Sequence, residues 1–333
     1  MIISYEMARP RSEKTLAIRQ SLLDLLHDGY HLPGQRFLSA RALALRYGVS
    51  YQTADRIIRE LCAEGRLERH AGSGTYIAGQ PKHLARAVLI FNERSKREGS
   101  FGDRLFRELS ARIDALGVSW KRGEPERVLE TRDLPVLWEC PRVLARLISD
   151  QRPAILLNDR PPAGLAATWI DSVVTDDFSG GVVAAELIRQ RGCPVAKPAI
   201  FSGPARDSRS QLRVAGFLSV FPKAGVVCAG TWDGALAEKK VSELARFKPD
   251  AIFCCNDRLA QAVHEKFRHL KLQPPFLIGF DDAPVADRLR LTTVALPWRQ
   301  LVDGAASLIQ KRLAGDCSHA VQLLYAPRPV VRG

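Results

Sequence analysis

The sequence predicts an α/β protein with an N-terminal winged helix-turn-helix domain, followed by a two-lobed, doubly wound domain with parallel sheets. Two observations predict this combination. Residues 33–77 hold short helices, a long helix and a hairpin, and from residue 87 onward apolar runs alternate with amphipathic segments. A chain of 333 residues also exceeds one ordinary domain. We expect a head over residues 1–79, a linker over 80–84 and an α/β domain over 85–333.

The head begins with a helix expected over Glu13–His27, where leucines form a wide apolar stripe. Ser39 can cap the next helix, because a serine oxygen accepts a hydrogen bond from a free N–H at a helix start. Gly48 supplies the left-handed residue that stops this helix. Ser50 then caps a helix from about Tyr51 to Glu64, which completes a helix-turn-helix.

A hairpin should follow this third helix. Gly65 ends the helix, and residues 67–70 and 75–77 alternate as two strands. The turn between them, Ala71-Gly72-Ser73-Gly74, is rich enough in glycine to bring backbone N–H groups against a phosphate. We interpret the hairpin as the wing of the domain.

These residues resemble the DNA-binding domain of the GntR family. The matching features are Pro33-Gly34, Ser39, Arg41, Val49-Ser50 and Gly72-Ser73-Gly74-Thr75. The resemblance implies double-stranded operator DNA as a partner. It also implies DNA contacts at Arg41, Ser50, Tyr51, Gln52, Thr53, His70 and Gly72.

Two positions depart from the family pattern, which commonly has arginine at the place of Tyr51 and a phosphate-facing residue at the place of Asp55. A carboxylate repels a phosphate. Asp55 therefore either points away and pairs with Arg59 one turn on, or accepts a hydrogen bond from a cytosine amino group.

The rest of the chain reads as strand, helix and strand repeated, which is typical of a doubly wound sheet. The expected strands cover residues 88–91, 118–120, 136–138, 154–158, 172–175, 199–202, 251–255 and 276–280. The expected helices cover residues 104–116, 143–150, 179–190, 210–221, 235–247 and 260–270. About 250 residues of this kind indicate two lobes.

Composition and charge narrow the class of protein. The net charge is +13, but residues 1–80 carry a net charge of only +3, so charge supports nucleic-acid binding weakly. The seven cysteines and seven histidines show no metal-binding spacing, and we expect no metal and no cofactor. No stretch reaches the roughly 20 apolar residues that a membrane span needs. We expect a cytoplasmic protein without membrane contact.

Motifs of catalysis are missing from the sequence. No GxGxxG or GxxxxGK[ST] follows an expected strand, and no GxSxG elbow occurs. Ser179-Gly180-Gly181 opens a helix but lacks the lysine of a phosphate loop. We expect no enzyme. The alternative is a bifunctional cytoplasmic enzyme that acts on a small metabolite and regulates its own synthesis by binding DNA.

Residues 84–333 resemble the effector-binding domain of the LacI family, which shares its fold with periplasmic binding proteins. The matching segments are Thr175–Gly181, Ser202–Pro204, Arg213–Phe217, Pro249–Phe253, Asn256-Asp257, Ile278–Asp282, Leu291–Val294 and Arg328–Gly333. A GntR head on a LacI-type body is the arrangement of the arabinose-repressor group, and this chain is similar to that arrangement.

The resemblance implies a ligand between two lobes, held at the carboxyl ends of strands. It places Asp159, Arg213, Trp232, Asn256, Asp281 and Trp298 there, and Phe101 is a further candidate. Carboxylates, an amide, an arginine and indole faces suit a sugar-like effector. Structural alternatives remain for several of these residues. Arg213 could pair with Asp207, Asp281 could cap a turn with Asp282, and both tryptophans could be core.

The loop after the first strand departs from the LacI pattern, because residues 92–103 are long and charged. Phe101 and Asp103 are its best candidates to reach a ligand. The segment could be a mobile flap, or the effector could differ from a common sugar.

Together these features predict a ligand-responsive transcriptional regulator, a repressor, that binds operator DNA as a homodimer. A small molecule, a sugar or sugar derivative, would alter its affinity for the operator by linkage.

Overall fold

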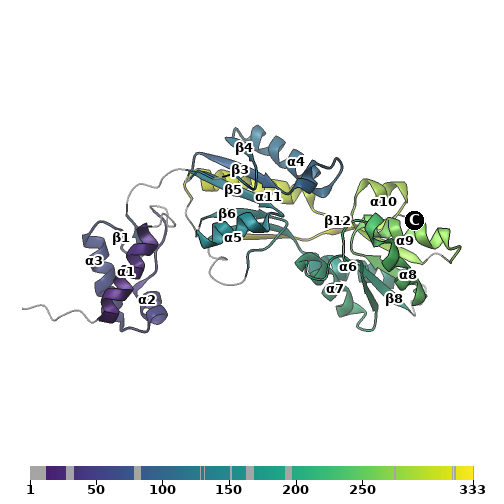
Figure 1. The fold of residues 1–333 in the computed structure, drawn as a ribbon, viewed down its shortest axis with the longest axis horizontal. Helices are drawn as coiled ribbons and strands as arrows, with labels where there is room; N and C mark the ends of the chain where they lie inside the picture. The colour runs from purple at the N-terminus through teal and green to yellow at the C-terminus, as the bar shows by residue number, and fades with distance from the viewer. Residues whose placement is uncertain are drawn as a thin grey trace, which may run out of the picture. The chain divides into compact units, whose positions relative to one another are not determined.

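The computed structural model describes residues 13–27, 34–78, 84–127, 129–130, 132–150, 152–162, 169–191, 197–273, 275–316, 318 and 320–332 (Figure 1). The expected linker at 80–84 therefore lies outside the described residues except for its last position. Contacts divide the chain into two compact units, residues 1–157 with 161–172 and 305–321, and residues 158–160 with 173–304 and 322–333. Among the described residues, no helix is both long and apolar enough to cross a membrane.

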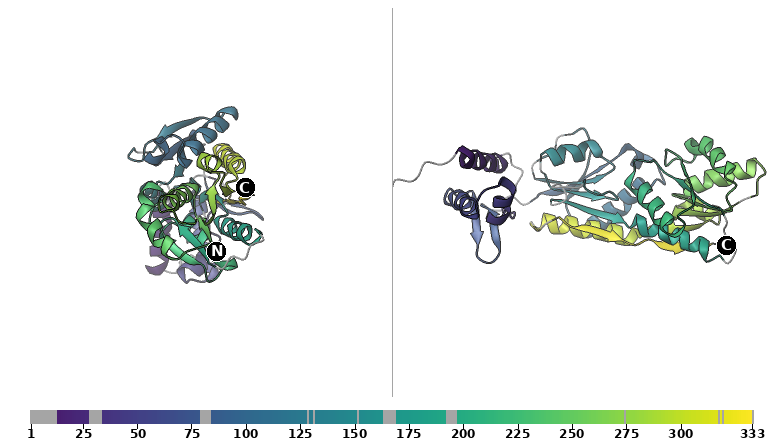
Figure 2. Two further views of the ribbon diagram at one scale, coloured as in Figure 1. Left: turned by 90° about the vertical axis from the view of Figure 1, so that its right-hand side faces the viewer. Right: turned by 90° about the horizontal axis from the view of Figure 1, so that it is seen from below.

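The head has the predicted elements. They are α1 Glu13–His27, α2 Ala40–Tyr47, α3 Tyr51–Ala63, β1 Leu67–His70 and β2 Gly74–Ile77. The strands β1 and β2 form an antiparallel ribbon, in which Leu67 pairs with Ile77 and His70 with Gly74, and the ribbon extends from the helices (Figure 2).

The predicted caps explain where the helices of the head begin and end. Ser39 Oγ accepts from the backbone N–H of Ala42 at 3.2 Å, and Gly48 has φ 59° at the end of α2. Ser50 Oγ accepts from the N–H of Thr53 at 3.1 Å and starts α3. The inner faces share one core that includes Leu22, Leu43, Ile57, Ile58 and Leu61. Burial of these aliphatic side chains holds three short helices together, which would be marginal in isolation.

The first α/β sheet has the strand order β13-β7-β6-β5-β3-β4. Its elements are β3 Arg86–Phe91, η1 Glu93–Lys96, α4 Phe101–Ala115, β4 Trp120–Gly123, β5 Asp133–Trp138, α5 Pro141–Ser149, β6 Ala154–Leu157, β7 Ile170–Thr175 and β13 Gln322–Tyr325. Strand residues alternate between two faces. Ile90 of β3 joins the core beneath α5, whereas Phe91 contacts Phe106 of α4 edge to face at 5.2 Å. Helices thus cover both faces of this sheet.

The second sheet has the order β14-β12-β11-β10-β8-β9. Its strands are β8 Pro198–Ser202, β9 Gly225–Cys228, β10 Ala251–Cys254, β11 Phe276–Asp281, β12 Thr292–Ala295 and β14 Arg328–Val330. Its helices are α6 Asp177–Arg189, α7 Ser208–Val220, η3 Ala235–Ala237, α8 Glu238–Arg246, α9 Asp257–His269 and α10 Pro284–Arg288. Ile252 of β10 belongs to the core beneath α8 and α9, while Phe253 stacks on Phe217 of α7. The doubly wound prediction is confirmed.

The helices α6 and α7 lie side by side because glycines let their backbones meet (Figure 1). A Cβ atom at Gly181 would collide with the carbonyl oxygen of Arg213, and one at Gly216 would collide with that of Phe178. The Ser179-Gly180-Gly181 motif thus serves close packing, but it does not start the helix, because α6 begins at Asp177 with Asp176 as its cap.

Several elements differ from their predicted bounds or were missed. The strand expected at 118–120 begins instead at Trp120, because the N–H of Val118 bonds back to Ile113 and extends the end of α4. Strand β5 begins earlier than predicted, at Asp133. The short strands β9, β12, β13 and β14 were not predicted. Nor was α11, Trp298–Leu313, where Gly304 weakens the helical pattern but makes room for the hydroxyl of Tyr325.

Candidate nucleic-acid interface and effector site

The first turn of α3 is the exposed end of the helix-turn-helix. Tyr51 is 55% exposed, and Gln52 is exposed beside it. Ser50, which is also exposed, and the half-buried Thr53 stabilise this turn, because their hydroxyl oxygens lie 2.9 Å apart in addition to the cap bond. Of the predicted DNA contacts of α3, Ser50 and Thr53 therefore build the cap, and Tyr51 and Gln52 lie beside it at the surface.

Asp55 joins α3 to the wing. Arg59 Nε lies 3.0 Å from Asp55 Oδ2, and Arg69 of β1 donates a hydrogen bond to Oδ1. The hydrogen bond from Arg69 lowers the pKa of Asp55 against the opposing effect of partial burial, and Arg59 adds to the lowering. The predicted pair with Arg59 is present, and Arg69 is a second partner that the sequence did not indicate.

The remaining predicted DNA residues of the head are also at the surface. Arg41 is exposed in the first turn of α2. The His70 ring contacts Tyr76 edge to face at 4.9 Å, and its side chain stays 57% exposed. Gly72, at φ 73°, occupies a left-handed position of the wing turn that favours glycine.

Against the second sheet, Arg213 of α7 lies at the centre of a buried charge cluster. Its side chain is 4% exposed, and Nε donates to Asp177 Oδ1 at 2.7 Å. Nη1 donates to the carbonyl oxygen of Cys255 and lies 3.5 Å from Asp281 Oδ1. The guanidinium carbon sits 3.6 Å from the centre of the Phe280 ring, a cation–π contact. Arg213 therefore does not pair with Asp207.

Asp281 is presented by an unusual turn. Asp281 and Asp282 both have left-handed backbone, with φ of 100° and 55°. Asp257 Oδ2 accepts from the N–H of Ala283 at 2.7 Å, and Arg332 Nη2 lies 2.7 Å from Asp282 Oδ1. Left-handed backbone is costly for residues other than glycine and persists where surrounding contacts fix it. Asp257 and Arg332 are such contacts, and they aim Asp281 at Arg213.

Two carboxyl groups of this cluster, those of Asp257 and Asp281, have raised pKa values. Burial and, next to it, the charge of Asp281 raise the pKa of Asp257 to about 8, although hydrogen bonds from Thr293 and Ala283 oppose the rise. Burial also raises the pKa of Asp281 to about 6, with Arg213 opposing. The Asp281 side chain remains 24% exposed, so water moderates its shift.

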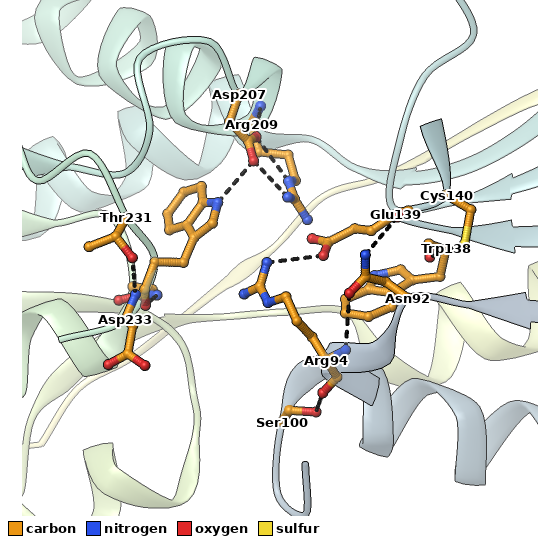
Figure 3. Close-up of polar contacts among 12 residues, drawn as sticks. Asn92, Arg94, Ser100, Trp138, Glu139, Cys140, Asp207, Arg209, Thr231 and Asp233 are labelled. Carbon is orange, nitrogen blue, oxygen red and sulfur yellow. Dashed lines mark hydrogen bonds and ion pairs between the residues drawn. The ribbon is translucent and has the colours of Figure 1, made fainter. Parts of the chain in front are cut away.

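Trp232 is fixed by its neighbours on one edge and one face. Its Nε1 donates to Asp207 Oδ2 at 2.9 Å, and Asp207 in turn pairs with Arg209 at 2.7 Å (Figure 3). Burial would raise the pKa of Asp207, but the hydrogen bonds from Arg209 and Trp232 outweigh it and lower the pKa to about 2. The indole packs on Gly203, where a Cβ atom would lie 2.6 Å from the ring.

Asn256 has a structural role at both ends of its carboxamide. Oδ1 accepts from the N–H of Leu259 at 2.7 Å and caps α9. Nδ2 donates to the carbonyl oxygen of Trp232 at 3.0 Å. Asn256 thereby links the start of α9 to the loop that carries Trp232.

The other predicted ligand residues lie apart from this cluster in the sequence. Asp159 follows β6 and accepts from the N–H of Arg160 at 2.8 Å. Trp298 is the first residue of α11 and is partly buried.

Phe101 begins α4 and stacks on Trp138 with ring centres 6.0 Å apart. The loop of residues 92–103 has regular structure, because Asn92 caps η1 and Ser100 caps α4. Arg94 Nη1 pairs with Glu139 Oε2 at 3.0 Å, and Asn92 Nδ2 donates to the carbonyl oxygen of Glu139 at 3.2 Å (Figure 3).

Sequence reasoning missed Asp177 and Asp257 as members of the cluster. Both are the first residue of a helix that follows a strand of the sheet, Asp177 in α6 and Asp257 in α9. That position was a usable signal, since the carboxyl ends of parallel strands meet at one edge of a sheet. Within the described ranges, no three His, Cys, Asp or Glu residues are arranged to hold a metal ion.

Two family models match parts of the chain. Residues 14–77 match the bacterial regulatory proteins of the gntR family, and residues 188–333 match a periplasmic binding protein-like domain. The first match covers the helices and wing of the head. The second covers most of the compact unit that contains Arg213, Trp232 and Asp281.

Curated relatives are transcriptional repressors by name. The HTH-type transcriptional repressor PurR of Vibrio vulnificus is 24% identical over 164 residues, 45% of this chain and 48% of the relative. The sucrose operon repressor of Streptococcus mutans is 28% identical over 152 residues, 43% of this chain and 47% of the relative. The chain spans about half the length of the curated relatives it matches.

Solved structures share the fold. A LacI family regulator from Enterococcus faecium with bound ribose has a TM-score of 0.61 at 17% identity, over 74% of this chain and 97% of the other. A complex of the transcriptional regulator CelR with cellobiose has a TM-score of 0.64 at 16% identity, over 97% of this chain and 99% of the other. The chain combines a gntR-type helix-turn-helix domain with a periplasmic binding protein-like domain of the fold found in LacI regulators.

Proposed function

We propose that the chain is a DNA-binding transcriptional repressor whose periplasmic binding protein-like domain binds a sugar or sugar derivative and thereby changes the affinity of the head for operator DNA. The observation that carries this proposal is the exposed first turn of α3, with Tyr51 and Gln52 presented by the Ser50 cap. Relatives named as repressors support it.

The DNA side of the proposal uses two kinds of contact. Arg41 and the wing at His70 and Gly72 contact phosphates, which supply affinity without sequence information. Tyr51 and Gln52 enter the major groove, where base edges are distinguishable. A homodimer would place two heads on half-sites about 10 base pairs apart or a multiple of that distance.

The effector side uses the cluster around Arg213. Asp281 accepts hydrogen bonds from sugar hydroxyls, and its 24% exposure leaves a ligand access to it. Trp232 offers an indole face that Asp207 and Gly203 hold in position. Asn256 acts through Trp232, because both ends of its carboxamide are engaged. Asp159, Trp298 and Phe101 stay predicted ligand contacts. Related folds that hold ribose and cellobiose favour a sugar.

The response follows from linkage. A ligand that binds one conformation more tightly shifts the population toward it, and a coupling of about 1 to 3 kcal/mol changes DNA occupancy several-fold or more. Only a differential affinity for the two conformations produces this shift.

A two-part experiment tests the proposal on the full chain. Binding to a pool of random double-stranded DNA is measured by fluorescence anisotropy over a range of salt concentrations. We expect affinity to fall steeply with salt, and Arg41→Ala to weaken binding and reduce the salt slope by about one unit. Binding that is absent at low salt, or that ignores salt, would contradict a DNA-binding head.

The second part is a thermal-shift screen against ribose, cellobiose, sugar acids, sugar phosphates and nucleosides. A ligand that binds only the folded state raises the melting temperature by mass action. We expect a sugar to do so for the wild type but not for Asp281→Asn, a variant that retains shape and still binds DNA. A shift of equal size in Asp281→Asn would remove Asp281 from the site.

A further inference from the structure

The geometry points to Gln52 as the base-reading side chain of the head, with an adenine in each half-site as its partner. This inference rests on the proposed DNA binding and names what the head reads. It follows from which side chains of α3 are buried, which are committed to other contacts and which remain at the surface.

The inner face of α3 is committed to the core of the head. Ala54, Ile57, Ile58 and Leu61 are each 0% exposed. The outer residues of the first two turns are Tyr51, Gln52, Asp55 and Arg56. Base reading by α3 must therefore come from this outer group.

Asp55 is removed from base reading by its two arginines. The two carboxylate oxygens of Asp55 already contact Arg59 and Arg69. The contact with Arg69 links α3 to β1 of the wing, so turning the carboxylate toward a cytosine amino group would loosen the domain surface that faces DNA. A carboxylate held there by two cations shapes the interface but does not select a cytosine.

The cap residues are likewise engaged. Ser50 Oγ accepts from the N–H of Thr53, and the two hydroxyl oxygens lie 2.9 Å apart. These bonds define where α3 begins. They leave the neighbouring side chain, Gln52, at the exposed corner of the first turn.

A glutamine carboxamide carries a donor and an acceptor side by side. Adenine presents the matching pair in the major groove, the N6 amino group and the N7 acceptor, whereas guanine presents two acceptors there. Tyr51, 55% exposed on the preceding position, can pack its ring on the methyl group of a thymine. Tyr51 and Gln52 therefore fit A·T pairs in each half-site. Arg56, exposed one turn further along α3, is suited to a phosphate or a guanine beside them.

The test is a selection from randomised double-stranded DNA with the full chain, followed by sequencing of the bound fraction. We expect the enriched sequences to share an adenine at one fixed position of each half-site. In Gln52→Arg that position should change to guanine, because arginine is bidentate to guanine O6 and N7. In Gln52→Ala the preferred site should bind roughly 5- to 150-fold more weakly, the range expected for losing one bidentate base contact.

Arg41→Ala is the matched comparison, because a lost phosphate contact weakens all sequences about equally and leaves the enriched base unchanged. Gln52 is exposed, so its variants should melt at the wild-type temperature. Enriched sequences that stay the same in Gln52→Arg would overturn the assignment of Gln52 while leaving the proposed DNA binding intact. No salt-dependent binding to any pool would overturn both.

Discussion

The outer face of α3 and the charge cluster around Arg213 are the two candidate binding regions, and they are built in opposite ways. Tyr51 and Gln52 stand at the surface on a helix that is fixed from its other side. Arg213 is 4% exposed and bound to Asp177, while Asp257 is 0% exposed. In the head, a side chain can be changed without disturbing the fold. In the cluster, the groups proposed to bind a ligand also hold the domain together.

This difference decides which experiments report on function. A substitution on α3 removes a contact with DNA and little else, because surface changes rarely alter stability by more than about 0.5 kcal/mol. A substitution at Arg213 leaves the buried Asp177 carboxyl group without its partner. Lost ligand binding would then not distinguish a missing contact from a damaged fold. Asp281, which keeps 24% of its side-chain surface, is the better probe of the effector site.

Arg213→Leu should produce the largest effect. Removing one partner of a buried ion pair costs about 3–5 kcal/mol, because Asp177 is left charged and without its cation. Urea unfolding followed by tryptophan fluorescence measures the loss. Arg213→Leu combined with Asp177→Leu should recover part of it. Gln52→Ala is the matched change in the head and should leave the unfolding free energy unaltered. A stable Arg213→Leu protein would show that the pair contributes nothing to the fold.

Gly216→Ala should have the next largest effect on the free energy of unfolding. A Cβ atom there meets the carbonyl oxygen of Phe178, so α6 and α7 must separate, and overpacking of this kind typically costs about 1–3 kcal/mol. Because these helices carry Asp177 and Arg213, we expect the sugar response to weaken as well, with DNA binding retained. Ala215→Ser, on the exposed side of α7, is the control. Equal melting temperatures for the two variants would contradict the close approach.

The same contrast explains what could be predicted from the sequence. The head was predictable almost residue by residue, because caps, glycines and turn residues are local signals. Ser39, Gly48 and Ser50 each fix a helix end at their own position in the chain. The α/β strands were predictable where they are buried and apolar. Short edge strands such as β9 and β13 were not, because their half-exposed patterns carry little periodicity.

The partners within the cluster could not be predicted for a different reason. Arg213 and Asp177 are 36 positions apart, and only the packing of α6 on α7 brings them together. The sequence placed Arg213 and Asp281 in the site by resemblance, but gave no means of choosing between Asp207 and Asp177 as the partner of Arg213. Nor did it indicate that Asn256 would be engaged at both ends.

The cluster around Arg213 should also make the stability of the protein depend on pH, through Asp257. The pKa of Asp257 is about 8 in the folded protein, well above the ordinary value of about 3.9. Between these values the folded state keeps a proton that the unfolded state releases. Stability should therefore fall as pH rises from about 4 to 8, by at most about 1.4 kcal/mol per pH unit for one proton, and level off above.

Asp257→Asn tests this directly, because an asparagine can still accept from the N–H of Ala283 and donate to Thr293. Between pH 6 and 8 the variant should lose less stability than the wild type. Glu243→Gln, an exposed change on α8, should leave the wild-type slope in place. Identical slopes in all three proteins would show that Asp257 titrates normally. Unfolding free energies from urea titrations at each pH supply the comparison.

Asp55→Asn should have the smallest effect on stability and a clear one on DNA binding. Each of its ion pairs lies near the surface, and such pairs contribute about 0.2–1 kcal/mol. The loss of a negative charge beside two arginines should raise affinity for every DNA sequence and steepen the salt dependence by about one unit, since Arg59 and Arg69 become available to phosphates. Anisotropy titrations at several salt concentrations measure both quantities.

If Asp55 instead accepted from a cytosine, the variant would lose affinity for its preferred site and gain none elsewhere. A rise in affinity for both preferred and random DNA would therefore show that Asp55 only holds α3 and the wing together. A fall in affinity for the preferred site would show that Asp55 contacts a base.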